Sequence, residues 1–362
     1  MPATEIVHIQ PAVSVVIPAR NEEACLGSCL QSLATQTGLT FEIILVDDHS
    51  TDRTREIASA FPQVRVIDAP PLPPGWTGKN NAVAAGACTA HAPWLLFTDA
   101  DTVHLPGSLQ RSLAEAERRG ASLLSYSPEQ IVKTFWEKAI MPVIFAELAA
   151  SYRPSQVSNP KSPAAAANGQ YILITREAYN AVGGHAAIAA NLLEDVVLAR
   201  AVKRSGRKIF FRYGPDAVRA RMYRNFSQLR EGWTKNLALL FPNPGRLALK
   251  TLLLWLIWAS LWMVAVFANI GRAWWNVADV AVFVLLAVRL RRSNFKWDRT
   301  VLGAIFGMPM FAYLLLRSRR AHAQGNVSWK GRSYGGCPKE GNKEPPVTNS
   351  MKRTSLTPGK LA

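Results

Sequence analysis

Cysteine is scarce in this chain, with four among 362 residues. The four, Cys25, Cys29, Cys88 and Cys337, are too few and too scattered to form a disulfide framework, and such usage is typical of a reducing compartment. Cys25 and Cys29 are four residues apart, but no histidine or further cysteine stands at a metal-ligand spacing from them. We therefore interpret both as small apolar residues on one face of a helix.

Three common sequence signatures are also absent. Residues 1–11 lack a basic start followed by an apolar stretch, so no cleaved signal peptide is expected. No Gly-x-Gly-x-x-Gly follows the first expected strand, which counts against binding of a nicotinamide dinucleotide. No Gly-x-x-x-x-Gly-Lys-Ser/Thr occurs either, which counts against a P-loop nucleotide site.

Acidic residues are rare in the C-terminal third. Residues 246–362 hold 18 Lys and Arg but only 4 Asp and Glu, whereas residues 1–245 hold 24 and 21. The basic region also contains the longest apolar runs, and basic residues that flank such runs are typical of membrane segments. A nucleic-acid surface would instead interleave Lys and Arg with aromatic residues on a folded face, so no nucleic-acid partner is expected.

Three apolar runs follow one another in this region. Residues 251–270 carry no charge and are long enough to span a bilayer. Residues 274–288 form a shorter run that contains Asp279, and residues 301–316 contain Pro309. We expect two or three hydrophobic membrane segments.

The charges around the third run do not decide whether it crosses the membrane. The connector 289–299 carries five basic residues and is expected on the cytoplasmic side. Either 301–316 is a re-entrant or interfacial hairpin, or the tail after it violates the positive-inside rule. We expect a transmembrane region over residues 246–320, followed by a basic tail, 321–362, that is disordered after about residue 337.

The first half alternates between two periodicities. Short apolar runs predict buried strands, and segments with helical spacing lie between them. Such repeated units predict an α/β fold with a mostly parallel sheet and right-handed crossovers. Strands are expected at 13–18, 42–46, 64–67, 94–98, 121–127, 169–175 and 208–213, and helices at 22–36, 52–60, 79–90, 106–119, 194–205 and 226–240.

Residues 131–152 differ from these segments. The stretch is amphipathic and aromatic, with Phe135, Trp136 and Phe145, and it is interrupted by charge. It is therefore not a clear membrane span, and we expect a helix that lies in the membrane interface.

Three pairs of acidic residues stand at the ends of expected elements. Carboxylates at the carboxyl ends of parallel strands meet at one edge of the sheet, where open α/β sheets bind ligands. An enzyme that acts on a phosphorylated substrate is therefore indicated. The pairs are Asp47 with Asp48, Asp99 with Asp101, and Glu194 with Asp195.

Each pair also has a plainer interpretation. Asp99 and Asp101 could hold one Mg²⁺ or Mn²⁺ that takes phosphate oxygens as further ligands, or they could be solvated turn residues. Asp48 could accept from a base or a ribose hydroxyl, or belong to a helix N-cap cluster. Asp195 could be a general base, or an acid favoured by the helix dipole. Lys79, at a helix start, could bind a diphosphate or be exposed.

Taken in order, these motifs resemble those of the family 2 glycosyltransferases with the GT-A fold. The resemblance covers roughly residues 12–233. A second string, 71–82, together with 327–334, is similar to the membrane-attached branch associated with hopanoid and carotenoid biosynthesis. The matching stretches of the first resemblance are 13–23, 44–52, 98–101, Gly183-Gly184 and Glu194-Asp195.

The resemblance implies a GT-A type, Rossmann-like domain over residues 1–245 and a nucleotide-sugar site within it. Asp48 would meet the uracil or ribose, with Asp47 as second choice, and Lys79 and Arg230 would lie near the diphosphate. The residues implied for the nucleotide sugar are Pro18, Ala19, Glu22, Asp47, Asp48, Lys79, Asp99, Arg230 and Trp233.

The resemblance also implies the chemistry. Asp101, with Asp99, would bind Mg²⁺ or Mn²⁺, and Asp195, beside Glu194, would be the base of an inverting single displacement. The expected reaction moves a sugar from a nucleotide sugar, a UDP-sugar in our interpretation, to a hydroxyl of a lipid or another membrane-associated acceptor. The catalytic domain would face the cytosol at the cytoplasmic membrane, on a multi-pass chain.

One departure from the family bears on the acceptor. Processive polysaccharide synthases carry Gln-x-x-Arg-Trp, but residues 229–233 here are Leu-Arg-Glu-Gly-Trp. This counts against a polysaccharide-synthase-like transferase, which stays an alternative. Two others are a catalytically inert membrane scaffold subunit and a nucleotidyltransferase, although residues 18–21, Pro-Ala-Arg-Asn, are not the Gly-rich loop of the latter.

Overall fold

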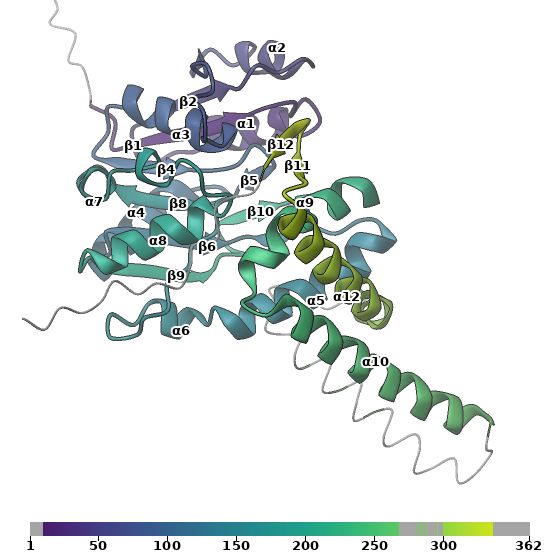
Figure 1. Ribbon diagram of the computed structural model, residues 1–362. Helices are drawn as coiled ribbons and strands as arrows, with labels where there is room; N and C mark the ends of the chain where they lie inside the picture. The colour runs from purple at the N-terminus through teal and green to yellow at the C-terminus, as the bar shows by residue number, and fades with distance from the viewer. Residues whose placement is uncertain are drawn as a thin grey trace, which may run out of the picture.

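The computed structural model describes residues 10–267 and 300–335, and between these ranges only residues 280, 284, 288 and 295. Its first hundred residues alternate strands with helices, as the apolar periodicity predicts (Figure 1). These elements are β1 (Val13–Ala19), α1 (Leu26–Ala34), β2 (Phe41–Asp47), α2 (Thr54–Ser59), β3 (Val64–Asp68), α3 (Gly78–Thr89) and β4 (Trp94–Phe97).

The following elements are less regular, and several of the short ones have no counterpart among the expected segments. They are β5 (Thr102–His104), α4 (Ser108–Arg119), β6 (Leu123–Ser127), β7 (Glu129–Gln130), α5 (Phe135–Ser151), α6 (Pro154–Val157), β8 (Ile172–Thr175), α7 (Arg176–Ala181), η1 (Ala186–Ile188), α8 (Glu194–Arg204), β9 (Ile209–Tyr213), β10 (Val218–Ala220), α9 (Phe226–Leu240), α10 (Pro244–Phe267), α12 (Thr300–Gln324), β11 (Val327–Trp329) and β12 (Arg332–Tyr334).

Seven strands form the central sheet, in the order β3-β2-β1-β4-β8-β6-β9. β1 pairs in parallel with β2 and β4, β2 with β3, and β6 with β9, so the prediction of a mostly parallel sheet is confirmed. β8 is an exception, because it runs antiparallel to both of its neighbours, β4 and β6. Since Ile172 pairs with Phe97, residues 168–170 reach the edge of the sheet at which β4 ends.

Helices cover both faces of this sheet. Val15 and Ile17 of β1 pack in one core with α1, α2 and α4. Val16, between them, packs in the other core with α3 and α8. Because alternate side chains enter two different cores, β1 reads in the sequence as a continuous apolar run.

A three-stranded sheet, β5-β10-β7, stands beside the carboxyl edge of the main sheet. β10 is antiparallel to β5 and parallel to β7. These strands are two or three residues long, too short to leave a periodicity that predicts them. β5 begins directly after Asp101, so its pairing with β10 anchors the loop that carries the acidic pair 99–101.

α5, α9, α10 and α12 form a helical unit beside the α/β body (Figure 1). The segment 301–316 lies within α12, which is one continuous helix although it contains Pro309. Its Phe311, Leu314 and Leu315 are buried against α5 and α9. The sequence left open whether 301–316 is a re-entrant or interfacial hairpin; in the structure the segment is helical, and part of it packs against protein.

Gly307 explains how closely α12 approaches α5. A Cβ added at Gly307 would overlap the backbone oxygen of Ala139 in α5. One turn earlier, a Cβ at Gly303 would lie at ordinary contact distance, 3.7 Å from Cα of Ala139. The middle of α5 is thus covered by α12, whereas Phe135 and Trp136 at its start are exposed.

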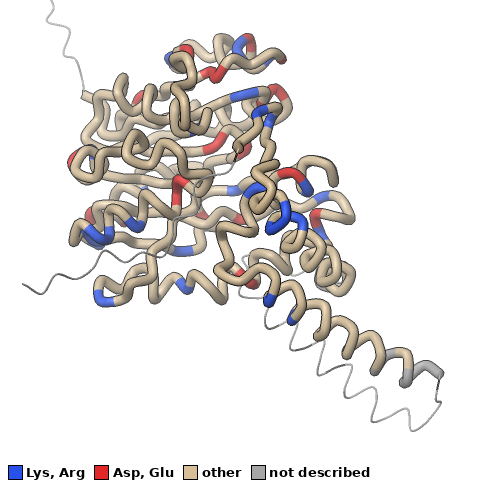
Figure 2. The backbone as a smooth tube through the Cα atoms, in the orientation of Figure 1, with Lys and Arg blue, Asp and Glu red and all other residues tan. Residues whose placement is uncertain are grey.

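No helix in the described part of the chain is both long enough and apolar enough to cross a membrane. The expected span 251–270 falls on α10 and continues beyond the described residues, and the expected span 274–288 lies outside them except at three positions. The structure therefore does not support the C-terminal membrane helices. α10 projects away from the body, with Lys and Arg only near its start (Figures 1 and 2).

The last described elements, β11 and β12, form a hairpin that returns to the α/β body (Figure 1). Its turn residues, Lys330 and Gly331, have φ values of 48° and 75°. Two successive positive φ values are typical of a type I′ turn, which suits the twist of a two-residue hairpin. The segment 327–334, known from the sequence only as a family-like string, is thus a folded element.

Candidate active site

A cavity of about 570 Å³ opens at the carboxyl edge of the central sheet. Its walls come from the ends of β1, β2 and β4, the loop before β8, and the starts of α3 and α8. α5, α9 and the β11–β12 hairpin close it from the helical side. This is the edge at which an open α/β sheet is expected to bind its ligand.

Ten of the twelve residues that the sequence singled out line this cavity. Asp47 and Arg230 do not. Asp47 is buried, accepts a hydrogen bond from the Ser50 backbone at 3.2 Å, and lies 3.7 Å from Arg55. It therefore supports the turn after β2. The ten are Pro18, Ala19, Glu22, Asp48, Lys79, Asp99, Asp101, Glu194, Asp195 and Trp233.

Lys79 connects two of the acidic pairs. Thr77 caps α3, its side chain accepting from Asn80 N at 3.2 Å, and this places Lys79 in the first turn. Its Nζ lies 2.7 Å from Asp99 Oδ1 and 2.7 Å from Glu194 Oε1. Burial lowers the pKa of Lys79, but the two carboxylates outweigh it and hold the pKa well above its usual value. The lysine is thus a fixed cation between the end of β4 and the start of α8.

Asp195 faces the same cavity from the first turn of α8. Its Oδ2 accepts from Gly169 N at 3.0 Å, and its Oδ1 from Val196 N at 2.8 Å. Burial, with the charge of Glu194, raises the pKa of Asp195 to about 6, although Lys79 opposes the shift. A carboxylate fixed by two backbone N–H groups, with a pKa near neutrality, is suited to accept a proton from a bound hydroxyl.

Asp101 is contacted by the side-chain amide of Gln170. Gln170 Nε2 donates to both of its oxygens at 3.3 Å, and it forms no salt bridge with any residue that the structure describes. Burial, together with the charges of Asp99 and Glu22, raises the pKa of Asp101 to about 7. A crowded carboxylate of this kind gains stability from a divalent cation.

The acid pair 99 and 101 fits a cation that is also held by the substrate. In the described ranges no group of three or more His, Cys, Asp or Glu side chains could hold a metal ion by itself. Mg²⁺ commonly binds to one or two carboxylates, with waters and phosphate oxygens completing the shell. Asp101 and Asp99 therefore suit an ion that arrives with a diphosphate.

Six lysines and arginines in the cavity wall were not singled out from the sequence, and three of them come from α9 and the C-terminal hairpin. Lys235 is half-buried on α9, and Lys330 and Arg332 come from the hairpin. Lys235 stands two positions after Trp233, so a search for cations near that tryptophan could have found it. No local pattern predicts that Lys330 and Arg332 reach a site built from residues 18–101, because the contact is long-range.

Part of the cavity wall is apolar. Phe145 and Leu148 line it from α5, Tyr152 from just after α5, Leu240 from α9, and Phe211 from β9. α9 also contributes polar side chains, so the cavity combines acidic and basic groups with an apolar part that comes mainly from α5. It can take a ligand with a charged part and an apolar part.

Comparison with known proteins agrees with this site. Residues 14–183 match the family model described as Glycosyl transferase family 2. The chain is similar to 4,4'-diaponeurosporenoate glycosyltransferase of Staphylococcus aureus strain USA300, with 26% identity over 339 residues that cover 89% of this chain and 88% of the relative. The corresponding protein of strain MRSA252 is 26% identical over 343 residues, with the same coverage.

One solved structure resembles the whole arrangement. The mannosyltransferase PcManGT from Pyrobaculum calidifontis, determined in complex with GDP-Man and Mn²⁺, covers 87% of this chain and 87% of its own, with a TM-score of 0.51 and 16% sequence identity. This likeness supports a GT-A-like α/β fold with a largely parallel central sheet.

Proposed function

The chain is a family 2 glycosyltransferase, and on this premise we propose that it moves a sugar, with inversion, from a UDP-sugar to an apolar, membrane-associated acceptor. The observation that carries the proposal is the cavity itself. Fixed carboxylates and cations line one part of it, and apolar residues, mainly from α5, line another. The first part suits a nucleoside diphosphate and the second suits a lipid.

Asp195 would be the general base. Its carboxylate takes the proton of an acceptor hydroxyl while that oxygen attacks the anomeric carbon of the donor. The bond between that carbon and the diphosphate oxygen breaks, and the nucleoside diphosphate leaves with the bonding electrons. The hydrogen bonds from Gly169 and Val196 hold the carboxylate in place during the transfer. Asp195 ends the step protonated.

Asp101 and Asp99 would hold Mg²⁺ or Mn²⁺, which when bound neutralises charge on the departing diphosphate. Asp101 is contacted by the neutral Gln170 amide and would be the main ligand, whereas Asp99 is paired with Lys79. Lys79 keeps the end of β4 and the start of α8 at a fixed separation, so that the proposed metal side and the proposed base stay aligned. Asp48, in the wall at the end of β2, would face the nucleoside.

The acceptor would enter along the apolar part of the cavity. The S. aureus relatives are named for 4,4'-diaponeurosporenoate, a carotenoid acid, and this supports an apolar acceptor here. A hydroxyl acceptor needs a base, which Asp195 would supply, whereas a carboxylate acceptor would not need one.

The helical unit would contact the cytoplasmic face of the membrane. Leu253 and Ile257 of α10 are 48% and 56% exposed, and Phe306 of α12 and Phe135 of α5 are 61% and 55% exposed. Apolar side chains exposed in such number on one unit mark an interaction surface, and a lipid surface fits their chemistry. The acceptor would then be drawn from the same surface.

Donor hydrolysis tests the proposal. Purified full-length protein is given UDP-, GDP- and TDP-sugars with and without Mg²⁺ or Mn²⁺, beside the variant Asp101→Ala. We expect slow, metal-dependent release of UDP that is lost in Asp101→Ala. Release of UDP that does not depend on a metal would mean that the proposed metal site is not needed for the reaction. No release from any donor, together with no nucleotide binding by calorimetry, would instead favour the inert scaffold.

A further inference from the structure

The C-terminal hairpin supplies two cations to the proposed donor side of the cavity. Arg332 reaches Asp48 with both terminal nitrogens, one of them at 2.9 Å from Oδ1. Lys330 Nζ pairs with Glu22 and donates to the backbone oxygen of Arg20 at 2.9 Å. Asp48 and Glu22 lie 284 and 308 residues earlier in the chain. The last folded element is thus tied directly to the loops after β1 and β2.

The fit of the hairpin is specific. A Cβ at Gly78 would overlap the guanidinium of Arg332, so glycine at the start of α3 leaves the space that the arginine fills. On the other side, Lys235 Nζ lies 5.1 Å from the centre of the Trp329 ring, a cation–π distance. The turn at Lys330, with φ of 48°, fixes the direction of its side chain. These contacts seat the hairpin between α3 and α9.

The charge of the cavity indicates what the hairpin does there. Seven acidic and seven basic side chains line the cavity, and Lys330 and Arg332 are two of the basic ones. Without the hairpin the wall would carry more acids than bases and would repel a nucleoside diphosphate. With the hairpin, two further cations stand next to the pocket in which Asp48 would meet the nucleoside.

We propose that Lys330 and Arg332 bind the diphosphate of the nucleotide-sugar donor, so that the C-terminal hairpin completes the donor site. This inference rests on the proposed function and adds residues to it. Both terminal nitrogens of Arg332 contact Asp48 in the cavity wall, and arginine is suited to bridge a carboxylate and a phosphate. Lys330 adds a point charge beside it.

The same contacts allow an opposite role, and the sign of one measurement separates the two. Both oxygens of Asp48 are engaged by Arg332. If the hairpin were a plug that the nucleotide must displace, removing Arg332 would free Asp48 and tighten nucleotide binding. If Arg332 binds the diphosphate, its removal weakens binding.

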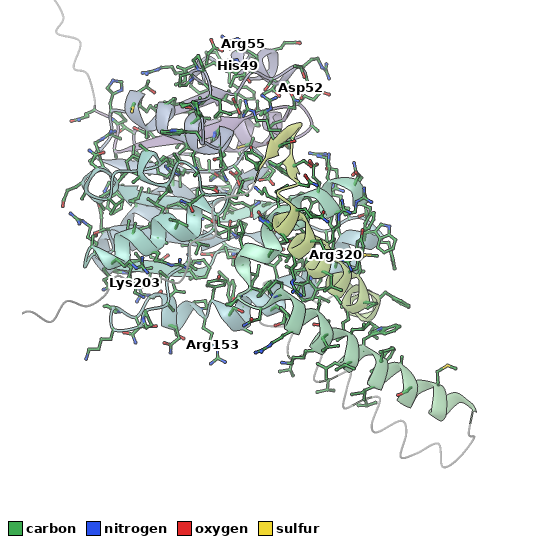
Figure 3. The ribbon with its side chains drawn as sticks, in the orientation of Figure 1. His49, Asp52, Arg55, Arg153, Lys203 and Arg320 are labelled. Atoms are coloured by element: carbon green, nitrogen blue, oxygen red, sulfur yellow. The ribbon has the colours of Figure 1, made fainter. Side chains whose placement is uncertain are left out.

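The experiment is calorimetric titration of the full-length protein with UDP and with uridine in the presence of Mg²⁺. Arg332→Ala and Lys330→Ala are each expected to weaken UDP binding about tenfold or more, as loss of a charge-assisted hydrogen bond does. Lys330→Ala should leave uridine binding unchanged, because Lys330 pairs with Glu22, whereas Arg332→Ala also frees Asp48 and should not weaken uridine binding. Arg332→Lys should recover part of the loss. The matched control is Arg320→Ala, since Arg320 lies exposed on α12 in the same C-terminal segment (Figure 3).

Each other outcome overturns the inference in its own way. Unchanged UDP affinity in both alanine variants would mean that the hairpin does not contribute to donor binding. Tighter UDP binding would mean that the hairpin is a plug that the nucleotide must displace. An equal loss of UDP and uridine binding, with a lower melting temperature than that of Arg320→Ala, would mean that the hairpin only stabilises the fold. If the wild-type protein binds neither UDP, GDP nor TDP, the proposed function fails first, so the two failures are distinguishable.

Discussion

The α/β body and the helical unit hold their parts of the cavity in different ways. In the body, strands buried on both faces end at one edge, and short hydrogen bonds fix Lys79, Asp99, Glu194 and Asp195 there. In the helical unit, α5, α9 and α12 share one apolar core, and many large apolar side chains stay exposed. The first arrangement suits chemistry that needs fixed geometry, and the second suits an apolar ligand.

The largest effect is expected in the body. Asp195→Asn keeps an oxygen for the Gly169 N–H but removes the base, so sugar transfer should fall by about 10²–10⁴-fold. Transfer assays measure the loss, and UDP affinity by calorimetry, expected to be unchanged, is the control. Full activity in this variant would mean that the acceptor reacts without a base, as a carboxylate would, and that the role of Asp195 is structural.

The pH dependence should report the same carboxylate. Because the pKa of Asp195 is raised to about 6, the deprotonated form of its carboxyl predominates above that pH and is lost as the pH falls below it. We expect kcat/KM to fall about tenfold per pH unit on the acid side. Glu194 contributes to the upward shift, so Glu194→Gln should move the midpoint to lower pH. A midpoint that stays in place would assign the titration to another group.

A smaller effect is expected in the helical unit. Gly307→Ala places a methyl group against the backbone of Ala139 and should destabilise the fold by about 1–3 kcal/mol, because backbone cannot give way easily. Gly303→Ala is the matched control, since its Cβ meets only ordinary contacts and gains up to about 1 kcal/mol of helix propensity. Thermal unfolding compares the two. Equal melting temperatures would mean that α12 does not pack on α5 as described.

The strands and most of the cavity residues were accessible from the sequence. β1, β2 and β4 read as apolar runs because both of their faces are covered, and each is followed by residues that line the cavity. The choice of Asp48 over Asp47 agrees with the cavity wall, whereas Arg230 lies outside it. Arg230 and Lys235 are five positions apart on α9 and so lie on different faces of the helix, and the sequence alone did not show that Lys235 lines the cavity.

The third apolar run shows what sequence reasoning left open. Residues 301–316 have the composition of a membrane segment, and hydropathy is the same whether an apolar residue meets lipid or protein. Gly307 explains why this segment meets protein, because it lets α12 contact the backbone of α5. That partner is more than 150 residues away in the chain, so no local pattern reveals it.

The sequence by itself determined the alternation of strands and helices and the edge at which the acidic pairs meet, because both follow from local periodicity and from the direction of parallel strands. Only the tertiary structure decided that β8 runs against its neighbours, that Lys79 joins Asp99 to Glu194, and that Arg332 reaches Asp48. Each of these depends on residues far apart in the chain that come together only when the two cores pack.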